Sequence, residues 1–99
     1  MDNSDHLLSF VTSKCGTMVS VHLDLGGVKL LLKELNGIRE KLEANDCPHT
    51  HLFGYQPSDD LTLTMLQSQP QENTSVEHVK IHGWNEEWAV RHGLKPGTA

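Results

Sequence analysis

The sequence is short of cysteine, aromatic residues and basic charge, and each shortage excludes a class of protein. Its two cysteines, Cys15 and Cys47, fit no CxxC spacing, so a recognisable zinc or redox motif is excluded and two reduced thiols are expected. Eight Lys and Arg stand against 13 Asp and Glu, a formal net charge of −5. Nucleic acid is therefore not an expected partner, because affinity for a phosphate backbone comes from clustered basic side chains.

Long apolar runs are also missing. The first ten residues, MDNSDHLLSF, have neither the basic start nor the apolar stretch of a signal peptide, and no segment predicts a membrane helix. A cytoplasmic protein with no membrane partner is the expectation. With 99 residues, 36% of them hydrophobic, the chain predicts one domain over 1–99, with its core in about 6–94 and a flexible tail at 95–99.

The chain alternates between strand and helix patterns. Alternating apolar residues predict a hairpin and three later strands, at 6–12, 17–25, 49–53, 61–67 and 76–84. From Val28 to Ala44 apolar residues recur at three- and four-residue steps, which predicts a helix whose apolar stripe covers a sheet. Gly26 and Gly27 are interpreted as a turn, Asn45 to Pro48 as the helix stop and 70–74 as a connector. The predicted fold class is α+β: a single domain with a mostly antiparallel sheet of about five strands, one amphipathic helix on one face, the order ββαβββ and a short C-terminal helix or turn.

Residues 76–94 combine both tryptophans with three histidines. Period-two alternation places Val79 and Ile81 on one face of a strand and the mixed set on the other, namely His78, Lys80, His82 and Trp84. Asn85 is expected to cap a short helix that ends at Gly93. Its inward side chains are expected to be Trp88, Val90 and Leu94.

No catalytic signature is present, so an enzyme is not expected and no cofactor is implied. The chain has no GxSxG elbow, no Cys-His signature and no phosphate-binding glycine loop. Histidines on two strands leave metal binding as an alternative, because imidazoles from neighbouring strands can bind zinc. The residues of that alternative site are His49, His51, His78 and His82.

Three segments carry a family resemblance: HTHLF (49–53), LTLT (61–64) and HVKIHGW (78–84). Across about residues 20–85 the chain resembles the immunity protein thirty-two family of bacterial polymorphic toxin systems. It departs from that family at Gly54 to Pro57, where the family has a Trp-Gly-Gly-like element. The resemblance implies a protein that binds and neutralises a cognate toxin domain without catalysis.

The expected contact surface combines the loop after the third strand with the mixed face of the last strand. Its residues are Tyr55, Asp59, Asp60, His78, Lys80, His82, Trp84, Glu86 and Glu87. Because the chain is acidic, the toxin is expected to present a basic surface, which would speed association by complementary charge. Two alternatives stay open: a small metal-binding protein, and a homodimer joined through an edge strand.

Overall fold

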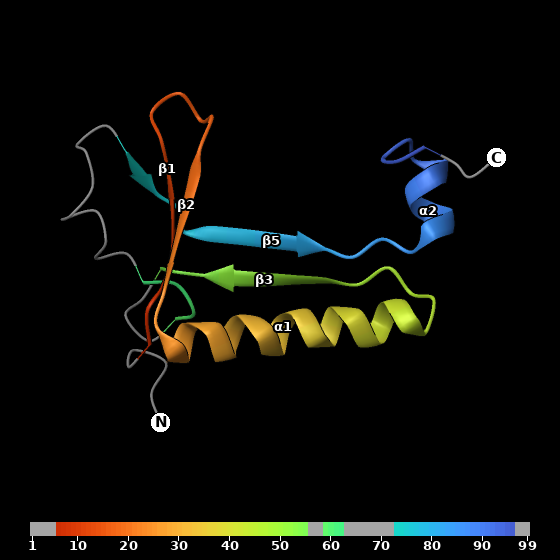
Figure 1. The fold of residues 1–99 in the computed structure, drawn as a ribbon, viewed down its shortest axis with the longest axis horizontal. Helices are drawn as coiled ribbons and strands as arrows, with labels where there is room; N and C mark the ends of the chain where they lie inside the picture. The colour runs from red at the N-terminus through yellow and green to blue at the C-terminus, as the bar shows by residue number, and fades with distance from the viewer. Residues whose placement is uncertain (1–5, 56–58, 63–72, 97–99) are drawn as a thin grey trace.

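The computed structural model describes residues 6–55, 59–62 and 73–96, which form an α+β fold of two small antiparallel sheets and one main helix (Figure 1). The predicted fold class is confirmed, but the strands divide between a three-stranded sheet, in the order β2-β1-β4, and a two-stranded sheet of β3 and β5. The elements are β1 (Leu8–Thr12), β2 (Val19–Leu23), α1 (Leu25–Glu43), β3 (His49–Phe53), β4 (Thr74–Ser75), β5 (His78–His82) and α2 (Glu86–Arg91).

The β1–β2 hairpin forms as predicted. Its two strands pair antiparallel from Leu8 opposite Leu23 to Thr12 opposite Val19, and Gly16 takes a φ of 72° in the turn, in the left-handed region that glycine enters at little cost. β2 keeps its period of two, yet its apolar side chains are between 38% and 56% exposed; these are Val19, Val21 and Leu23. The pattern thus predicts the strand but not a buried face.

Helix α1 begins three residues earlier than predicted. Asp24 is the N-cap, and its Oδ1 accepts hydrogen bonds from the backbone N–H of Gly27 at 2.8 Å and of Leu7 at 2.9 Å. Gly26 and Gly27 therefore belong to the first helical turn, and their interpretation as a turn is wrong. The physical reason is close packing: a Cβ on Gly27 would lie 1.8 Å from the Leu7 carbonyl oxygen.

The C-terminal end of α1 follows the stop predicted from Asn45 to Pro48. The helix ends at Glu43, one residue before the predicted Ala44, and Asn45 takes a φ of 66°. Asp46 N–H donates to the Lys41 carbonyl and Asn45 N–H to the Leu42 carbonyl, both at 2.9 Å, which is the Schellman pattern with Asn in the left-handed position. No helix in the described ranges is long and apolar enough to span a membrane.

The core lies where α1 meets both sheets. Leu8, Leu52 and Leu61 form its buried cluster, and partly buried apolar side chains pack against it: Phe10, Leu30, Leu31, Val79 and Ile81. Ile38 on α1 is also buried, as predicted. The apolar stripe of α1 extends beyond the part that packs on the sheets. Val28, Leu32 and Leu35 belong to this stripe and are exposed.

The predicted fourth strand is not observed where the structure describes it. Leu61 is buried and its N–H donates to the Phe53 carbonyl at 2.9 Å, but 61–62 form no strand and residues 63–67 lie outside the described ranges. A short strand instead appears at Thr74–Ser75, within and just after the predicted connector, and pairs antiparallel with Val11 and Thr12 of β1. Only two residues long, it carries too little alternation to be recognised from sequence.

Candidate functional site: an exposed strip of aromatic and imidazole rings

The two-stranded sheet separates its side chains as predicted. Val79 and Ile81 of β5 share one face with Thr50 and Leu52 of β3, and this face contributes to the core. The other face holds cross-strand pairs that set rings beside one another: His49 opposite His82, His51 opposite Lys80, and Phe53 opposite His78. Directly opposite side chains in an antiparallel pair lie close enough to interact, so the register itself assembles the ring face.

Nine rings on this face and its continuation lie in an unbroken series, which we call the ring strip. Neighbouring centroids are 4.7 to 6.1 Å apart, within the range of stacked and edge-to-face ring pairs. In order along the surface the rings belong to Tyr55, Phe53, His78, His51, His49, His82, Trp84, His92 and Trp88. Arg91 extends the series, because its guanidinium carbon lies 4.8 Å from the Trp88 ring centroid.

Helix α2 carries the distal end of the strip. Asn85 caps it as predicted, accepting a hydrogen bond from Trp88 N–H at 2.9 Å, and Gly93 ends it with a φ of 72°. The buried face of α2 holds Asn85 and Ala89, four residues apart.

The expectation that Trp88 and Leu94 point inward is wrong. Trp88 is 40% exposed and Leu94 is 58% exposed, whereas Val90 is partly buried. The small pair Asn85 and Ala89 occupies the side of α2 that faces the body, so the larger Trp88 ring is turned outward against His92.

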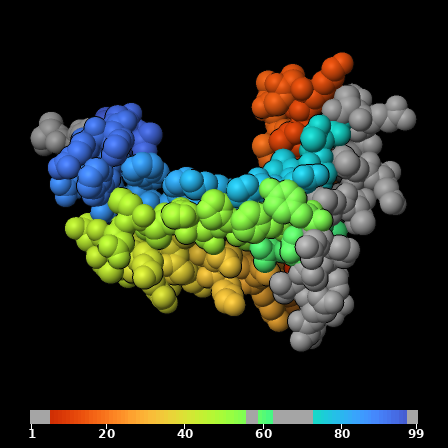
Figure 2. Space-filling view, turned by 180° about the vertical axis from the view of Figure 1, so that it is seen from behind, coloured from red at the N-terminus to blue at the C-terminus, as the bar shows by residue number. Residues whose placement is uncertain are grey.

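The strip occupies an accessible part of the surface. Trp84 is 40% exposed and Tyr55 61% exposed, while His51 is half-buried among its neighbours. In Figure 2 the hairpin and α2 stand at the two ends of β5, with a hollow between them. A partner can therefore reach the strands that carry most of the rings.

An imidazole pair lies near the centre of the strip. His51 Nδ1 and His78 Nε2 are 2.7 Å apart and share a hydrogen bond, so one ring nitrogen donates while the other accepts. Partial burial, and then the charges of His78, His49, Lys80 and His82, lower the pKa of His51 from its ordinary value of 6.5. The neutral form of His51 is thus the form that the fold favours.

This pair gives the free energy of unfolding a pH dependence. In the unfolded chain His51 binds a proton as the pH falls through 6.5, whereas in the folded chain its pKa is lower. The contribution of His51 to the free energy of unfolding is therefore fully present above pH 6.5 and is lost as the pH falls toward the lowered pKa. We expect His51→Phe, which keeps a ring but cannot titrate, to flatten the stability profile just below pH 6.5. Urea unfolding at a series of pH values measures this, and an unchanged difference between the two proteins across that interval would contradict it.

The predicted acidic contacts border the strip, and their carboxylates are engaged within the chain. Asp59 Oδ2 accepts a hydrogen bond from Tyr55 N–H at 3.0 Å, and Asp60 Oδ2 accepts one from Phe53 N–H at 3.4 Å. Glu86 pairs with Lys95 at 2.7 Å and Glu87 with Arg91 at 2.9 Å. Asp59 and Asp60 therefore bind the backbone of Tyr55 and Phe53, and the two glutamates pair with basic side chains on the outer side of α2 and just after it.

The four histidines of the metal alternative do lie on one face. His49, His51 and His82 are linked by ring contacts, and His78 is bonded to His51. Within the described ranges, no group of three or more His, Cys, Asp or Glu side chains is arranged to hold a metal ion. The imidazoles contact one another through their rings and one shared hydrogen bond.

Both cysteines are free and exposed, in agreement with the expected reduced thiols. Cys15 lies in the hairpin turn, and a hydrogen bond to the Thr17 hydroxyl at 2.8 Å, followed by the backbone and Ser13, lowers its pKa from 9.0 to about 7. A substantial fraction of this thiol is therefore ionised at neutral pH.

The structure adds ring-strip residues that were not among the predicted contacts: His49, His51, Phe53, Trp88, Arg91 and His92. A signal for some of them exists in the sequence. Rings occupy every second position from His49 to Tyr55. His78, His82 and Trp84 keep the same period around Lys80, and Trp88 and His92 then follow at steps of four. Periods of two and about four on either side of a strand-to-helix junction keep one face continuous.

Comparison with known proteins adds no relative: no family model matches the chain, and neither a curated protein nor a solved structure matches it.

Proposed function

We propose that this chain is a protein-binding module, and specifically an immunity protein that neutralises a cognate toxin domain in the cytoplasm through the ring strip. The observation that supports the proposal is the uninterrupted series of partly exposed rings from Tyr55 to Trp88. Trp, Tyr and Arg are the residue types that most often dominate binding energy at protein interfaces; the strip contains Trp and Tyr, and Arg91 lies against its Trp88 end.

The arrangement of charge around the strip has the form of a protein interface. Rings occupy the middle, and exposed ion pairs such as Glu87 with Arg91 lie at the border. Interfaces typically have an aromatic, partly apolar centre and a polar rim that remains in contact with water. The acidic residues at the border suit the basic toxin surface that is expected from the net negative charge of the chain, because complementary rim charge mainly raises the association rate.

The test needs a candidate toxin domain, for which the gene immediately upstream is the place to look, and it measures the binding of that domain to this chain. We expect Trp84→Ala and Trp88→Ala each to weaken binding at least tenfold, since each removes an exposed ring from the middle or end of the strip. Isothermal calorimetry would measure the dissociation constant. Leu25→Ala is the matched control, because Leu25 is a large exposed apolar residue on α1, outside the strip.

Two outcomes would contradict the proposal. One is a dissociation constant that neither tryptophan substitution changes while circular dichroism shows a folded chain. The other is an equal loss of binding in Leu25→Ala, which would indicate a different surface. Binding that disappears in EDTA and returns with zinc would instead favour the alternative in which His49, His51, His78 and His82 hold a metal.

A further inference from the structure

The two-stranded sheet has one edge that no described strand covers. Among the residues that the structure describes, β5 pairs with β3 along one side and with no strand along the other. In Figure 2 this second side of β5 borders the hollow between the hairpin and α2. The outer side of β3 is occupied where the strand ends, because Phe53 N–H donates to Asp60 Oδ2 and the Phe53 carbonyl accepts from Leu61 N–H. The outer edge of β5 is therefore the side to which this sheet can add a strand.

The register of the sheet identifies the backbone groups at that edge. Gly54 N–H donates to the Glu77 carbonyl at 2.8 Å, at one end of the β3–β5 ladder. Hydrogen-bonded pairs in an antiparallel ladder alternate with pairs that are not hydrogen-bonded, so Val79 and Ile81 direct their N–H and C=O groups toward β3. The residues between and beside them direct theirs toward the hollow: His78, Lys80 and His82.

These backbone groups specify the kind of molecule that would cover the edge. They recur at every second residue, about 6.6 Å apart, and each position offers one donor and one acceptor. Another extended chain presents complementary groups at the same spacing, which is how peptides add to exposed sheet edges. The five residues of β5 span about 17 Å, so the edge matches an extended segment of similar length.

The side chains of β5 indicate the composition of that segment. Val79 and Ile81 pack against the core but are only partly buried, so apolar side chains on a neighbouring strand would cover them further. On the other face Lys80 is central, and it is the one permanently charged side chain of β5. A carboxylate on the neighbouring strand would pair with it, because opposite charges on adjacent strands attract. The matching segment alternates apolar with polar residues and carries an acid among the polar ones.

The open edge adjoins the ring strip. Lys80 lies opposite His51, and His78 and His82 on either side of Lys80 both belong to the strip. The residues whose backbone groups point into the hollow are thus the residues whose side chains form the ring face. A strand added to β5 would place its own polar side chains beside the rings, and one partner would contact both surfaces.

We propose that the partner places an extended segment in the hollow, where it pairs with β5 as the third strand of the β3–β5 sheet. This rests on the proposed function and adds the mode of binding, in which backbone hydrogen bonds along the edge supplement contacts to the rings. The acid beside Lys80 belongs to the inserted segment alone. The toxin surface around it is still expected to be basic, because Glu86 and Glu87 lie at the border of the strip.

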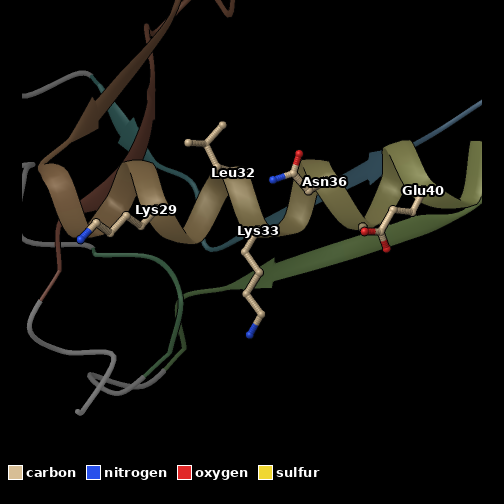
Figure 3. Close-up of a pocket in the computed structure, with 6 residues that line it drawn as sticks. Lys29, Leu32, Lys33, Asn36 and Glu40 are labelled. Carbon is tan, nitrogen blue, oxygen red and sulfur yellow. The ribbon is translucent and has the colours of Figure 1, made fainter.

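A second recess, on α1, lacks such backbone groups and supplies a control. It is a shallow groove lined by Lys29, Leu32, Lys33, Asn36, Gly37 and Glu40 (Figure 3). N–H and C=O groups inside a helix bond one another, so this groove presents side chains only. Lys33→Gln therefore removes one positive charge from the chain, as a neutral substitution of Lys80 does, without touching the edge of β5.

Amide hydrogen exchange of the chain bound to the candidate toxin domain tests the proposal. Exchange at the Lys80 and His82 amides is expected to slow by about tenfold or more on binding, because both N–H groups become bonded to the added strand. The Val79 and Ile81 amides already face β3 and should slow much less. Contact with the rings alone would leave the Lys80 amide exchanging at the rate of the free chain.

Proline at position 80 tests the same bonds by calorimetry. Lys80→Pro removes the central outward N–H but no bond to β3, and edge strands tolerate proline at such positions. It is expected to weaken binding roughly 100-fold, because the ring also obstructs the approach of a strand. Lys80→Thr keeps the N–H and loses the charge, so it should weaken binding by about fivefold at most. Lys33→Gln should bind as wild type does.

Four results would overturn the proposal. Two of them are a folded Lys80→Pro protein that binds as wild type does, and a Lys80 amide that exchanges equally fast in the free chain and the complex. If Trp84→Ala still abolishes binding in those cases, the proposed function stands and the mode of binding alone fails. A domain that does not bind would contradict both. A wild-type dimer that Lys80→Pro dissociates would assign the edge to a second copy. If Lys80→Pro does not fold, hydrogen exchange of the wild-type complex decides.

Discussion

Replacing Gly27 with Ala is expected to lower the free energy of unfolding by about 3 kcal/mol or more. The new Cβ would lie 1.8 Å from the Leu7 carbonyl oxygen and 2.9 Å from the carbonyl carbon, both backbone atoms that no rotamer change can move. The first turn of α1 would have to shift away from the chain that leads into β1, and the hydrogen bonds to Asp24 would lengthen with it. Overpacking with side chains as neighbours costs about 1–3 kcal/mol, and here the neighbour is less yielding.

Gly37→Ala in the same helix is the matched control, with the opposite expected sign. No atom lies within 4 Å of the position its Cβ would occupy, and alanine is favoured over glycine inside a helix by about 1 kcal/mol. Urea unfolding of both variants measures the two effects on one element. A destabilisation of similar size in both would contradict the prediction, because the cost at Gly27 would then not come from the approach to Leu7.

Asn85→Ala is expected to destabilise α2 locally by about 2 kcal/mol, because it removes an N-cap and a buried hydrogen bond together. The Asn85 Oδ1 accepts from Trp88 N–H, and its Nδ2 donates to the Asn45 carbonyl, each at 2.9 Å. Asn85 therefore joins the start of α2 to Asn45, the residue after the C-cap of α1. Hydrogen exchange should show about 30-fold lower protection of the α2 amides, with β1 and β2 amides unchanged.

Asn85→Asp separates the two contributions. Aspartate keeps an oxygen to cap Trp88 N–H but cannot donate to the Asn45 carbonyl, so it should preserve the α2 helix and still weaken its attachment. We expect the α2 amides of Asn85→Asp to be less protected than those of wild type and more protected than those of Asn85→Ala. Equal protection in all three proteins would mean that ring contacts, such as that between Trp84 and His92, hold α2 in place without Asn85.

Sequence patterns located those elements whose signals are local. The 49–53 strand, the alternation of Val79 and Ile81 with the histidines, and the cap at Asn85 all depend on periodicity or on one residue beside its own backbone. Gly27 could not be interpreted this way, because its role depends on the Leu7 carbonyl, 20 residues earlier in the chain. The division into two sheets likewise depends on long-range pairing, which periodicity does not encode.

The candidate site was predictable in part for the same reason. The spacing of His78, His82 and Trp84 predicts one mixed face, but the sequence does not specify the register that sets Phe53 opposite His78. The sequence predicts a core position for Trp88, because large apolar residues are usually buried. Its exposure follows from the small side chains of Asn85 and Ala89, which allow α2 to approach the body with its other face.

Lys80 has a consequence for handling the protein in solution. Among the described strands β5 pairs only with β3, so its other edge lines the hollow with backbone groups suited to recruit a further strand. Its sequence, HVKIH, has a single permanently charged residue, at the centre. Two such edges meeting antiparallel would bring two lysines together, and this repulsion opposes aggregation. A variant selected for tighter binding that loses Lys80 would therefore lose colloidal stability as well.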